Sequence, residues 1–335
     1  MSTKRIAAIL TLVMFFFTLA NAGKPVPPPP TPPPSNPALV YSDAGAIKIA
    51  NPDGSSPWVL LGPANVHDRK GPYSNHQNPS WSPDGQWVVF WSQMPIRPAN
   101  HPELNATGEG IYKISVDGQF LCKVTSVGTG SFPPHPVWSP AIPPGWSRQK
   151  IAYQVHLLDP GAQTCPPNNC HFNIFLVDTD CSAAPAVNIT NRVDVTAWEP
   201  AWSPDATKLA VAVQWRSLGI GQNIALFSVD GPTSTFEVDL GKPPTTSLYD
   251  PDWSRDGGTI AAYGAGGVWT YTLPYGPWIL VSPGDQADSW PTWSPDSSQI
   301  IFVRDRRQIW TMDALGLETP VLLVPSGSDP DRRRF

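Results

Sequence analysis

Pro-Ser-Trp-Ser-Pro-Asp-Gly, at residues 79–85, decides the fold because close copies of this stretch recur along the chain. Five copies share a proline, a tryptophan two positions later and then a serine. A β-propeller blade of four strands takes about 40 to 50 residues, so spacing of this order predicts blades, with insertions lengthening the early ones. The motif tryptophans are 57, 64, 51 and 40 residues apart, at Trp81, Trp138, Trp202, Trp253 and Trp293.

The parts of the repeat have separate structural roles. Ser-Pro-Asp-Gly is typical of a β-turn, because proline presets φ and aspartate and glycine suit the later turn positions. β-Rich runs follow each turn and predict buried strands. A further strand of this kind recurs six times, at residues 47–49, 111–114, 174–177, 224–227, 268–271 and 309–312. We therefore predict an all-β, six-bladed β-propeller of four-stranded antiparallel blades, with the motif tryptophans packed between neighbouring blades.

The first blade has no copy of the motif strand. The C-terminal stretch Asp-Pro-Asp-Arg at residues 329–332 matches Asp-Pro-Asp-Trp at residues 250–253 in three of four positions. We predict that the tail supplies the missing strand, so that pairing of the N- and C-terminal segments closes the ring and removes open sheet edges.

The N-terminus predicts export. Lys4 and Arg5 precede a mostly apolar run at residues 6–19, and Ala20-Asn21-Ala22 has small residues where a signal peptidase reads. The domains expected are a signal peptide at 1–22 cleaved after Ala22, a proline-rich linker at 23–37 and the propeller at 38–335. The apolar run is shorter than the roughly 20 residues of a spanning helix, so we expect a periplasmic or secreted protein without stable membrane insertion.

Prolines dominate residues 25–34, a composition that favours polyproline II. We interpret this stretch as a semi-rigid spacer. A ligand for a proline-reading partner is the alternative.

Charge and composition narrow the partners. The formal net charge is −5 and no stripe of Lys and Arg is present, which argues against nucleic acid as a partner. No Gly-x-Ser-x-Gly elbow of a hydrolase occurs. We expect a monomer that binds a protein, peptide or glycan.

The repeated Pro-x-Trp-Ser-Pro-Asp-Gly turn, followed by Ile-Ala-Phe-like strands, resembles the repeats of the TolB-type propeller family over nearly the whole chain after residue 38. The resemblance implies a fold rather than a function, because similar repeats occur in periplasmic binding proteins, in lyases and in the propellers of prolyl oligopeptidase-like peptidases.

Four cysteines in an exported chain predict two disulfides. Cys165 and Cys170 share one inter-strand loop, whereas Cys181 lies about 30 Å further along an extended strand, so we expect Cys165 to pair with Cys170. Cys122 and Cys181 fall near equivalent turns of adjacent blades, which favours a second bridge between them.

One face of the ring is predicted to carry the ligand site. The longest connections, such as residues 93–110 and 156–170, should lie on the same face, and binding sites are usually formed by such loops. The residues immediately before the five motif prolines, with three neighbours, should surround the mouth of the central channel. These candidate ligand-binding residues are His76, Asn78, His135, Trp198, Glu199, Tyr249, Asp250 and Trp290. The alternative is that they cap strand ends and satisfy backbone groups.

The function predicted from these features is non-catalytic binding of a protein, peptide or glycan on the looped face. No catalytic residue, metal or cofactor is assigned. One alternative is a metal-dependent lyase of the oligogalacturonate type, for which His76, His135, Glu199 and Asp250 would be the ligands. Another alternative is an envelope protein similar to those of the Tol system.

Overall fold

The computed structural model describes residue 34 and residues 36–62, 76–93, 108–127, 133–159, 170–181, 185–216, 221–244, 246–282 and 287–333. The predicted signal peptide at 1–22 and most of the predicted linker at 23–37 lie outside these residues. The chain divides into two compact units, Met1–Thr31 and Pro32–Phe335, and the second contains everything described below.

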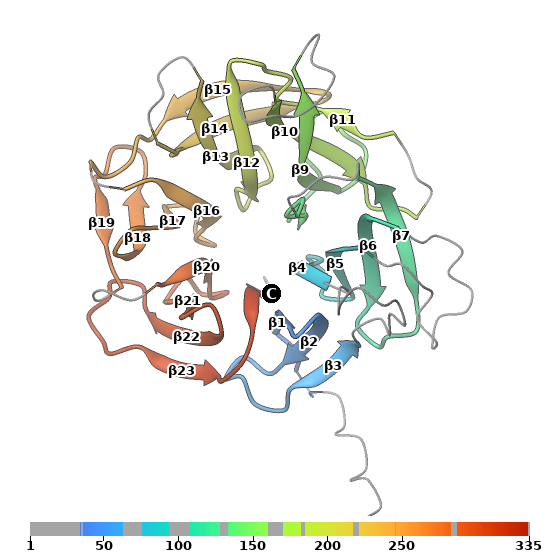
Figure 1. The fold of residues 1–335 in the computed structure, drawn as a ribbon, viewed down its shortest axis with the longest axis vertical. Helices are drawn as coiled ribbons and strands as arrows, with labels where there is room; N and C mark the ends of the chain where they lie inside the picture. The colour runs from blue at the N-terminus through green and yellow to red at the C-terminus, as the bar shows by residue number, and fades with distance from the viewer. Residues whose placement is uncertain are drawn as a thin grey trace, which may run out of the picture. The chain divides into compact units, whose positions relative to one another are not determined.

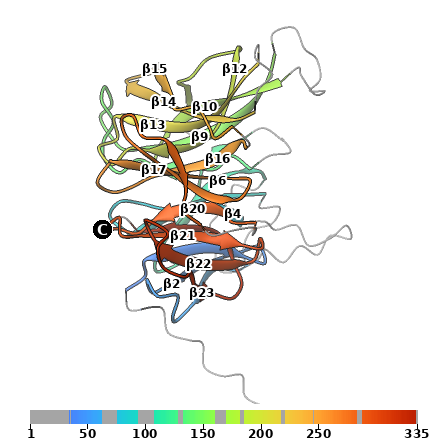
Figure 2. The same ribbon diagram turned by 90° about the vertical axis from the view of Figure 1, so that its left-hand side faces the viewer.

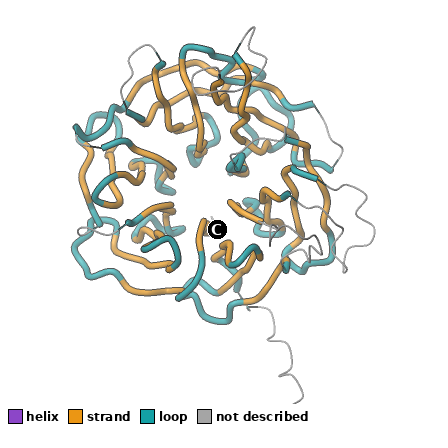
Figure 3. The backbone as a smooth tube through the Cα atoms, viewed as in Figure 1, coloured by secondary structure: helices purple, strands orange, loops and turns teal. Residues whose placement is uncertain are grey.

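Six antiparallel sheets of four strands each form a ring (Figure 1). The described backbone consists of strands and connecting loops without helices (Figure 3). The predicted fold class, a six-bladed propeller of four-stranded blades, is confirmed.

Blades 1 to 3 occupy the first half of the chain, apart from one C-terminal strand in blade 1. From the centre outward, their strands are β24 (Ser328–Arg332), β1 (Leu39–Asp43), β2 (Ala46–Ala50) and β3 (Trp58–Leu61) in blade 1; β4 (His76–Trp81), β5 (Trp87–Ser92), β6 (Gly110–Ser115) and β7 (Leu121–Ser126) in blade 2; and β8 (Val137–Trp138), β9 (Lys150–Leu158), β10 (Cys170–Asp178) and β11 (Val187–Asn188) in blade 3.

Blades 4 to 6 follow in chain order. Their strands are β12 (Val195–Trp202), β13 (Lys208–Trp215), β14 (Asn223–Asp230) and β15 (Thr233–Asp239) in blade 4; β16 (Leu248–Trp253), β17 (Thr259–Gly264), β18 (Gly267–Thr272) and β19 (Trp278–Leu280) in blade 5; and β20 (Ser289–Trp293), β21 (Gln299–Arg304), β22 (Gln308–Asp313) and β23 (Val321–Val324) in blade 6. Blade 4 and blade 1 lie on opposite sides of the ring in both ribbon views (Figures 1 and 2).

The Ser-Pro-Asp turn is held by its own side chains. In blade 2, the Ser82 hydroxyl donates to Asp84 Oδ1 at 2.6 Å and accepts from the Trp87 amide at 2.9 Å. The same pair of bonds recurs in the turns of blades 4, 5 and 6. These bonds satisfy backbone groups at the strand ends, which explains why serine and aspartate accompany the proline.

The motif tryptophans pack between blades. Each is buried, and each belongs to a cluster that also contains core residues of the preceding blade. Trp202 of blade 4, for example, is fully buried among Ile174 and Leu176 of blade 3. The interface between blades 6 and 1 differs, because its cluster contains no motif tryptophan and Arg332 occupies the corresponding strand position, with 5% exposure.

The C-terminal strand is the innermost strand of blade 1. β24 pairs antiparallel with β1, with Leu39 opposite Arg332 and Val40 opposite Asp331. The tail also contacts blade 2, because Asp331 Oδ2 accepts from the Trp81 amide at 2.8 Å. Asp252 makes the equivalent bond to the Trp293 amide of blade 6 at 2.9 Å.

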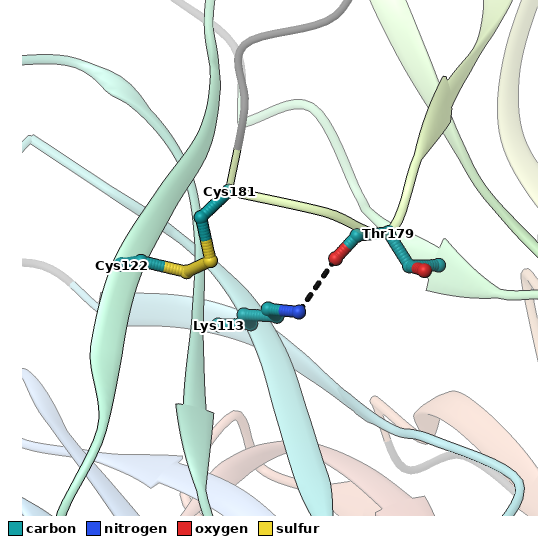
Figure 4. The surroundings of a disulfide bond; sticks show 4 residues. All are labelled: Lys113, Cys122, Thr179 and Cys181. Carbon is teal, nitrogen blue, oxygen red and sulfur yellow. Dashed lines mark hydrogen bonds between the residues drawn. A yellow bond between two sulfur atoms is a disulfide. The ribbon is translucent and has the colours of Figure 1, made fainter.

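A disulfide links blades 2 and 3. It joins Cys122 in β7 to Cys181 after β10, with a Cα–Cα distance of 5.8 Å (Figure 4). Beside it, Lys113 donates to the Thr179 carbonyl at 2.6 Å across the same interface. Cys170 is also disulfide-bonded, whereas its expected partner Cys165 lies outside the described residues. A disulfide is consistent with an exported protein.

Among the described residues, none belongs to a helix of the length and apolar character needed to cross a membrane.

Deletion of residues 326–335 tests the role of the tail in closing the ring. We expect a strong fall in Tm, since the deletion removes β24 and exposes β1. A milder change is Asp331→Asn, which weakens the bond to the Trp81 amide and should cost about 1 kcal/mol. Thermal unfolding measured by circular dichroism gives both values, and an unchanged Tm in the deletion variant would refute the closure role.

Trp202→Ala tests the packing between blades. The side chain is fully buried, so its loss should cost about 3 to 5 kcal/mol of unfolding free energy through the cavity that remains. Denaturant unfolding provides the measurement. Trp58→Ala on the outer strand β3, where the side chain is only half-buried, is the control and should cost clearly less.

Candidate functional site

The inner strand of the blades carries a bulge at the residue before the motif proline. Strand pairing shifts register between Gln77 and Ser80 in blade 2, and between Trp198 and Ala201 in blade 4. Blades 5, 6 and 1 shift at the corresponding place. Proline fits there because a bulge leaves backbone groups outside the ladder, so the missing N–H costs no strand hydrogen bond.

The residue before each proline has a left-handed backbone conformation. The six φ values lie between 44° and 54°, at Asn78 (51°), His135 (44°), Glu199 (54°), Asp250 (44°), Trp290 (50°) and Asp329 (49°). Non-glycine residues rarely adopt this conformation, at a cost of about 1 to 3 kcal/mol each when the surrounding structure enforces it. This backbone conformation therefore fixes the direction of six side chains, all of which are polar or aromatic groups suited to recognition.

These residues converge on the axis of the ring. Together with the two residues that follow each of them, they line a cavity of about 100 Å³ at the centre. Each blade contributes one three-residue segment, beginning at Asn78, His135, Glu199, Asp250, Trp290 or Asp329.

His135, Asp250 and Glu199 form the polar centre of the cavity. His135 Nδ1 lies 3.3 Å from Asp250 Oδ1, and the side-chain exposures are 19% and 12%. Asn78 Nδ2 lies 3.4 Å from the same imidazole nitrogen. Glu199 Oε2 accepts from the Asp250 amide at 2.8 Å, so the contacts of these groups connect blades 2, 3, 4 and 5.

The second oxygen of the Asp250 carboxylate, Oδ2, is buried and has no hydrogen-bond partner among the described residues. An uncompensated buried carboxylate oxygen is costly. A donor supplied by a ligand would remove that cost.

Burial and mutual repulsion raise the pKa values of the acids. The pKa of Glu199 is raised to about 8, first by burial and then by the Asp250 carboxylate. The pKa of Asp329 is also raised by burial, which outweighs the opposing effect of His135. For His135, burial lowers the pKa, but the charge and hydrogen bond of Asp250 outweigh it and raise the pKa to about 9. At neutral pH the imidazole is therefore protonated and Glu199 is largely neutral.

A glutamine of blade 3 fixes the backbone of Glu199. Gln154 Oε1 accepts from the Glu199 amide at 2.7 Å, and Gln154 Nε2 donates to the Pro133 carbonyl at 2.7 Å. Because both bonds hold a 6%-exposed side chain, the position of Glu199 is set by the scaffold.

Five of the eight residues proposed from the sequence line the cavity: Asn78, His135, Glu199, Asp250 and Trp290. The other three lie elsewhere. His76 is fully buried at the start of β4, with Nδ1 2.8 Å from the Ser92 hydroxyl, and burial lowers its pKa to about 4.

Trp198 and Tyr249 precede cavity residues but do not line the cavity. Trp198 meets Phe172 edge-on, with ring centroids 6.1 Å apart. Tyr249 donates to Gln222 Oε1 at 2.9 Å and stacks on Tyr263. Side chains alternate along a strand, so the residue before a bulge residue points away from the axis.

Asp329 is the residue before a cavity proline that the candidate set lacks. The signal was present, because Asp329 aligns with Asp250 in the match between the tail and blade 5. That match was used to predict a strand, and the first residue of the matched stretch, Asp329, also lines the cavity.

Three groups of the cavity have the spacing of metal ligands. One donor atom each from His135, Glu199 and Asp250 lie within 4.8 Å of one another. Ligand atoms around a single ion at about 2.1 to 2.4 Å would have such separations. The same atoms could equally surround the ammonium or guanidinium group of a ligand.

Comparison with known proteins identifies the fold. No family model matches the chain, and no curated protein matches it. Among solved structures, the chain is similar to TolB from Acinetobacter baumannii, with a TM-score of 0.60 and 16% identity, covering 89% of this chain and 66% of that one. The chain thus spans slightly less than two thirds of that protein.

Two further solved structures are also similar to the chain. A protein described as TolB from Agrobacterium tumefaciens has a TM-score of 0.53 and 16% identity, covering 88% of this chain and 91% of that one. A puromycin-hydrolyzing peptidase from Mycobacterium tuberculosis has a TM-score of 0.50 and 16% identity, covering 87% of this chain and 44% of that one. Identity at this level establishes the fold and not the activity. The chain has the fold of a TolB-like six-bladed β-propeller.

Proposed function

We propose that this protein is an exported binding propeller that captures a protein or peptide by admitting one of its cationic groups into the central cavity. The observation that carries the proposal is the convergence of the Glu199, Asp250 and Asp329 carboxyl groups on one small space beside a single imidazole. A lysine, arginine or N-terminal amine would supply hydrogen-bond donors to these carboxyl groups and a positive charge that favours their ionised forms.

The size of the cavity favours the tip of a large partner over a whole small ligand. Pockets that bury small molecules usually measure about 300 to 1,000 Å³, whereas this cavity measures about 100 Å³. A saccharide would remain mostly outside it. A single side chain of a protein or peptide fits the available volume, with the rest of the partner on the surrounding face.

The scaffold favours binding without rearrangement. The left-handed backbone before each proline and the Gln154 bonds fix the acidic groups before a ligand arrives. Such preorganisation lowers the entropy that binding must offset.

A divalent cation at the same place is the second candidate, supported by the spacing of His135, Glu199 and Asp250. His135 would first have to lose its proton, which its raised pKa disfavours at neutral pH. Bound to those residues, the ion would leave coordination positions open to a substrate oxygen, as a lyase acting on acidic polysaccharides would need.

Paired peptide arrays test the leading proposal. Each peptide carries a single Lys or Arg, and its partner carries Gln at that position. We expect the protein from Gly23 to bind members of the cationic set and to lose at least tenfold in affinity for the Gln partners. Equal binding of the paired peptides would rule out cation capture.

Charge-neutralising variants locate the binding in the cavity. Glu199→Gln and Asp250→Asn should each abolish binding of the best array peptide, since each removes a carboxyl group that would be ionised beside the bound cationic group. The Tm of Glu199→Gln should stay nearly unchanged at pH 7, because the carboxyl is already largely protonated there. Glu318→Gln, at an exposed position of blade 6, is the matched control and should bind as the wild type does. Unfolding of both cavity variants would instead support a structural role.

The raised pKa of Glu199 predicts a pH dependence with a defined sign. A cationic ligand favours the ionised carboxylate, so binding below pH 8 releases a proton and tightens as pH rises. Isothermal titration of the best array peptide between pH 6 and 8 should show an affinity gain of about tenfold or more. The Glu199→Gln variant should lose this slope, and a slope of opposite sign would contradict the assignment.

Elemental analysis separates the two candidates. For the peptide site, EDTA should leave binding unchanged and the purified protein should carry no stoichiometric metal. Tightly bound metal, together with turnover of an acidic polysaccharide that disappears in His135→Ala, would instead establish the enzyme.

A further inference from the structure

A larger cleft lies between blades 4 and 5, away from the central cavity. It measures about 620 Å³ and is bordered by the β12–β13 turn, β15 and the β18–β19 turn. Its floor consists of side chains that belong to the core between these blades, namely Leu226, Leu240, Trp253 and Tyr271. The cleft therefore opens directly onto apolar and aromatic surface.

Exposed side chains of the cleft indicate a ligand with apolar groups. Tyr275, at the border, is 91% exposed, and Val238 beside the floor is 42% exposed. Apolar groups of a ligand would cover these exposed side chains.

The charges of the cleft favour a basic ligand. Asp205, Glu237 and Asp256 border it, together with one lysine, Lys208, which is paired with Glu237. Three acids against one base leave an excess of two negative charges.

We propose that this cleft binds the proline-rich segment at residues 23–33 of a second copy of the protein. Polyproline II leaves every backbone carbonyl free and presents flat apolar rings, and aromatic-lined grooves recognise it. Lys24 directly precedes the first proline of the segment, opposite in charge to the acidic border. Cleavage after Ala22 would add the amine of Gly23, so that two positive charges meet the two excess negative charges.

The position of the cleft favours a segment from another copy. The chain enters the propeller at β1 in blade 1, and blades 5 and 6 lie between blade 1 and the cleft on one side of the ring. Blades 2, 3 and 4 lie between them on the other side (Figures 1 and 2). The same segment of a second molecule could reach the cleft without extending past these blades. The association would be weak and would depend on concentration, unlike the monomer expected from the sequence.

A synthetic peptide tests the interaction directly. The fluorescein-labelled peptide of residues 23–36 is titrated with the protein from Gly23, and binding is measured by anisotropy. We expect saturable binding that weakens at least tenfold in Tyr275→Ala, and a parallel loss when the peptide carries Lys24→Glu. Added salt should weaken the binding of the wild-type peptide and have less effect on the binding of the Lys24→Glu peptide.

Blade 2 supplies the matched control. Phe120 is 68% exposed near the turn between β6 and β7, the counterpart of the β18–β19 turn, so Phe120→Ala removes an exposed aromatic ring outside the cleft. This variant should bind the peptide as the wild type does. Both side chains are exposed, so neither substitution should unfold the protein, and equal Tm values check this.

Sedimentation of the protein from Gly23 completes the test. We expect the weight-average mass to rise with concentration and to stay at the monomer value in Tyr275→Ala. Failure of the peptide to bind at millimolar concentration, or equal binding by Tyr275→Ala, would overturn the proposal. Peptide binding at the cleft without self-association would overturn the choice of a second copy as the partner.

Discussion

The x-Pro bulge on the inner strands is the constraint on which the rest of this structure depends. Proline removes a strand hydrogen bond, and the bulge accommodates that loss while giving the preceding residue a positive φ. The same dipeptide thus marks each repeat and directs one side chain of every blade toward the ring axis. Fold and candidate site cannot be separated at these positions, because the residue that lines the cavity is also the residue that carries the backbone strain.

The interfaces between blades supply the stability that such a site requires. Five of them bury a motif tryptophan among core residues of the preceding blade. At the sixth, between blades 6 and 1, buried Arg332 stands in its place and donates to the Pro52 carbonyl. Burial lowers the pKa of this guanidinium, and its Nε has no partner among the described residues. This interface therefore has a buried charged side chain at the position where the other five have a tryptophan.

The sequence predicts the fold well because the repeat acts locally. Turn residues, a β-rich run and a buried tryptophan each follow from neighbouring residues, so the blade count could be read from the chain. The candidate site was predicted only in part. The repeat located Glu199 and Asp250, but the alternation of side chains at a bulge removes Trp198 and Tyr249 from the cavity. The protonation states of His135 and Glu199 could not be predicted from the sequence either, since they depend on distances between groups of different blades.

The two concave regions differ in how they obtain specificity. The central cavity gathers polar and charged groups from all six blades, so recognition there would be electrostatic. Because the cavity is small, a ligand group must enter it end-on. The cleft between blades 4 and 5 draws on only two blades, and its floor is the apolar core itself, so it suits an extended ligand lying along the surface. A rigid ring allows both, because neither requires the blades to move: the bulges fix the first, and the packing around Trp253 fixes the second.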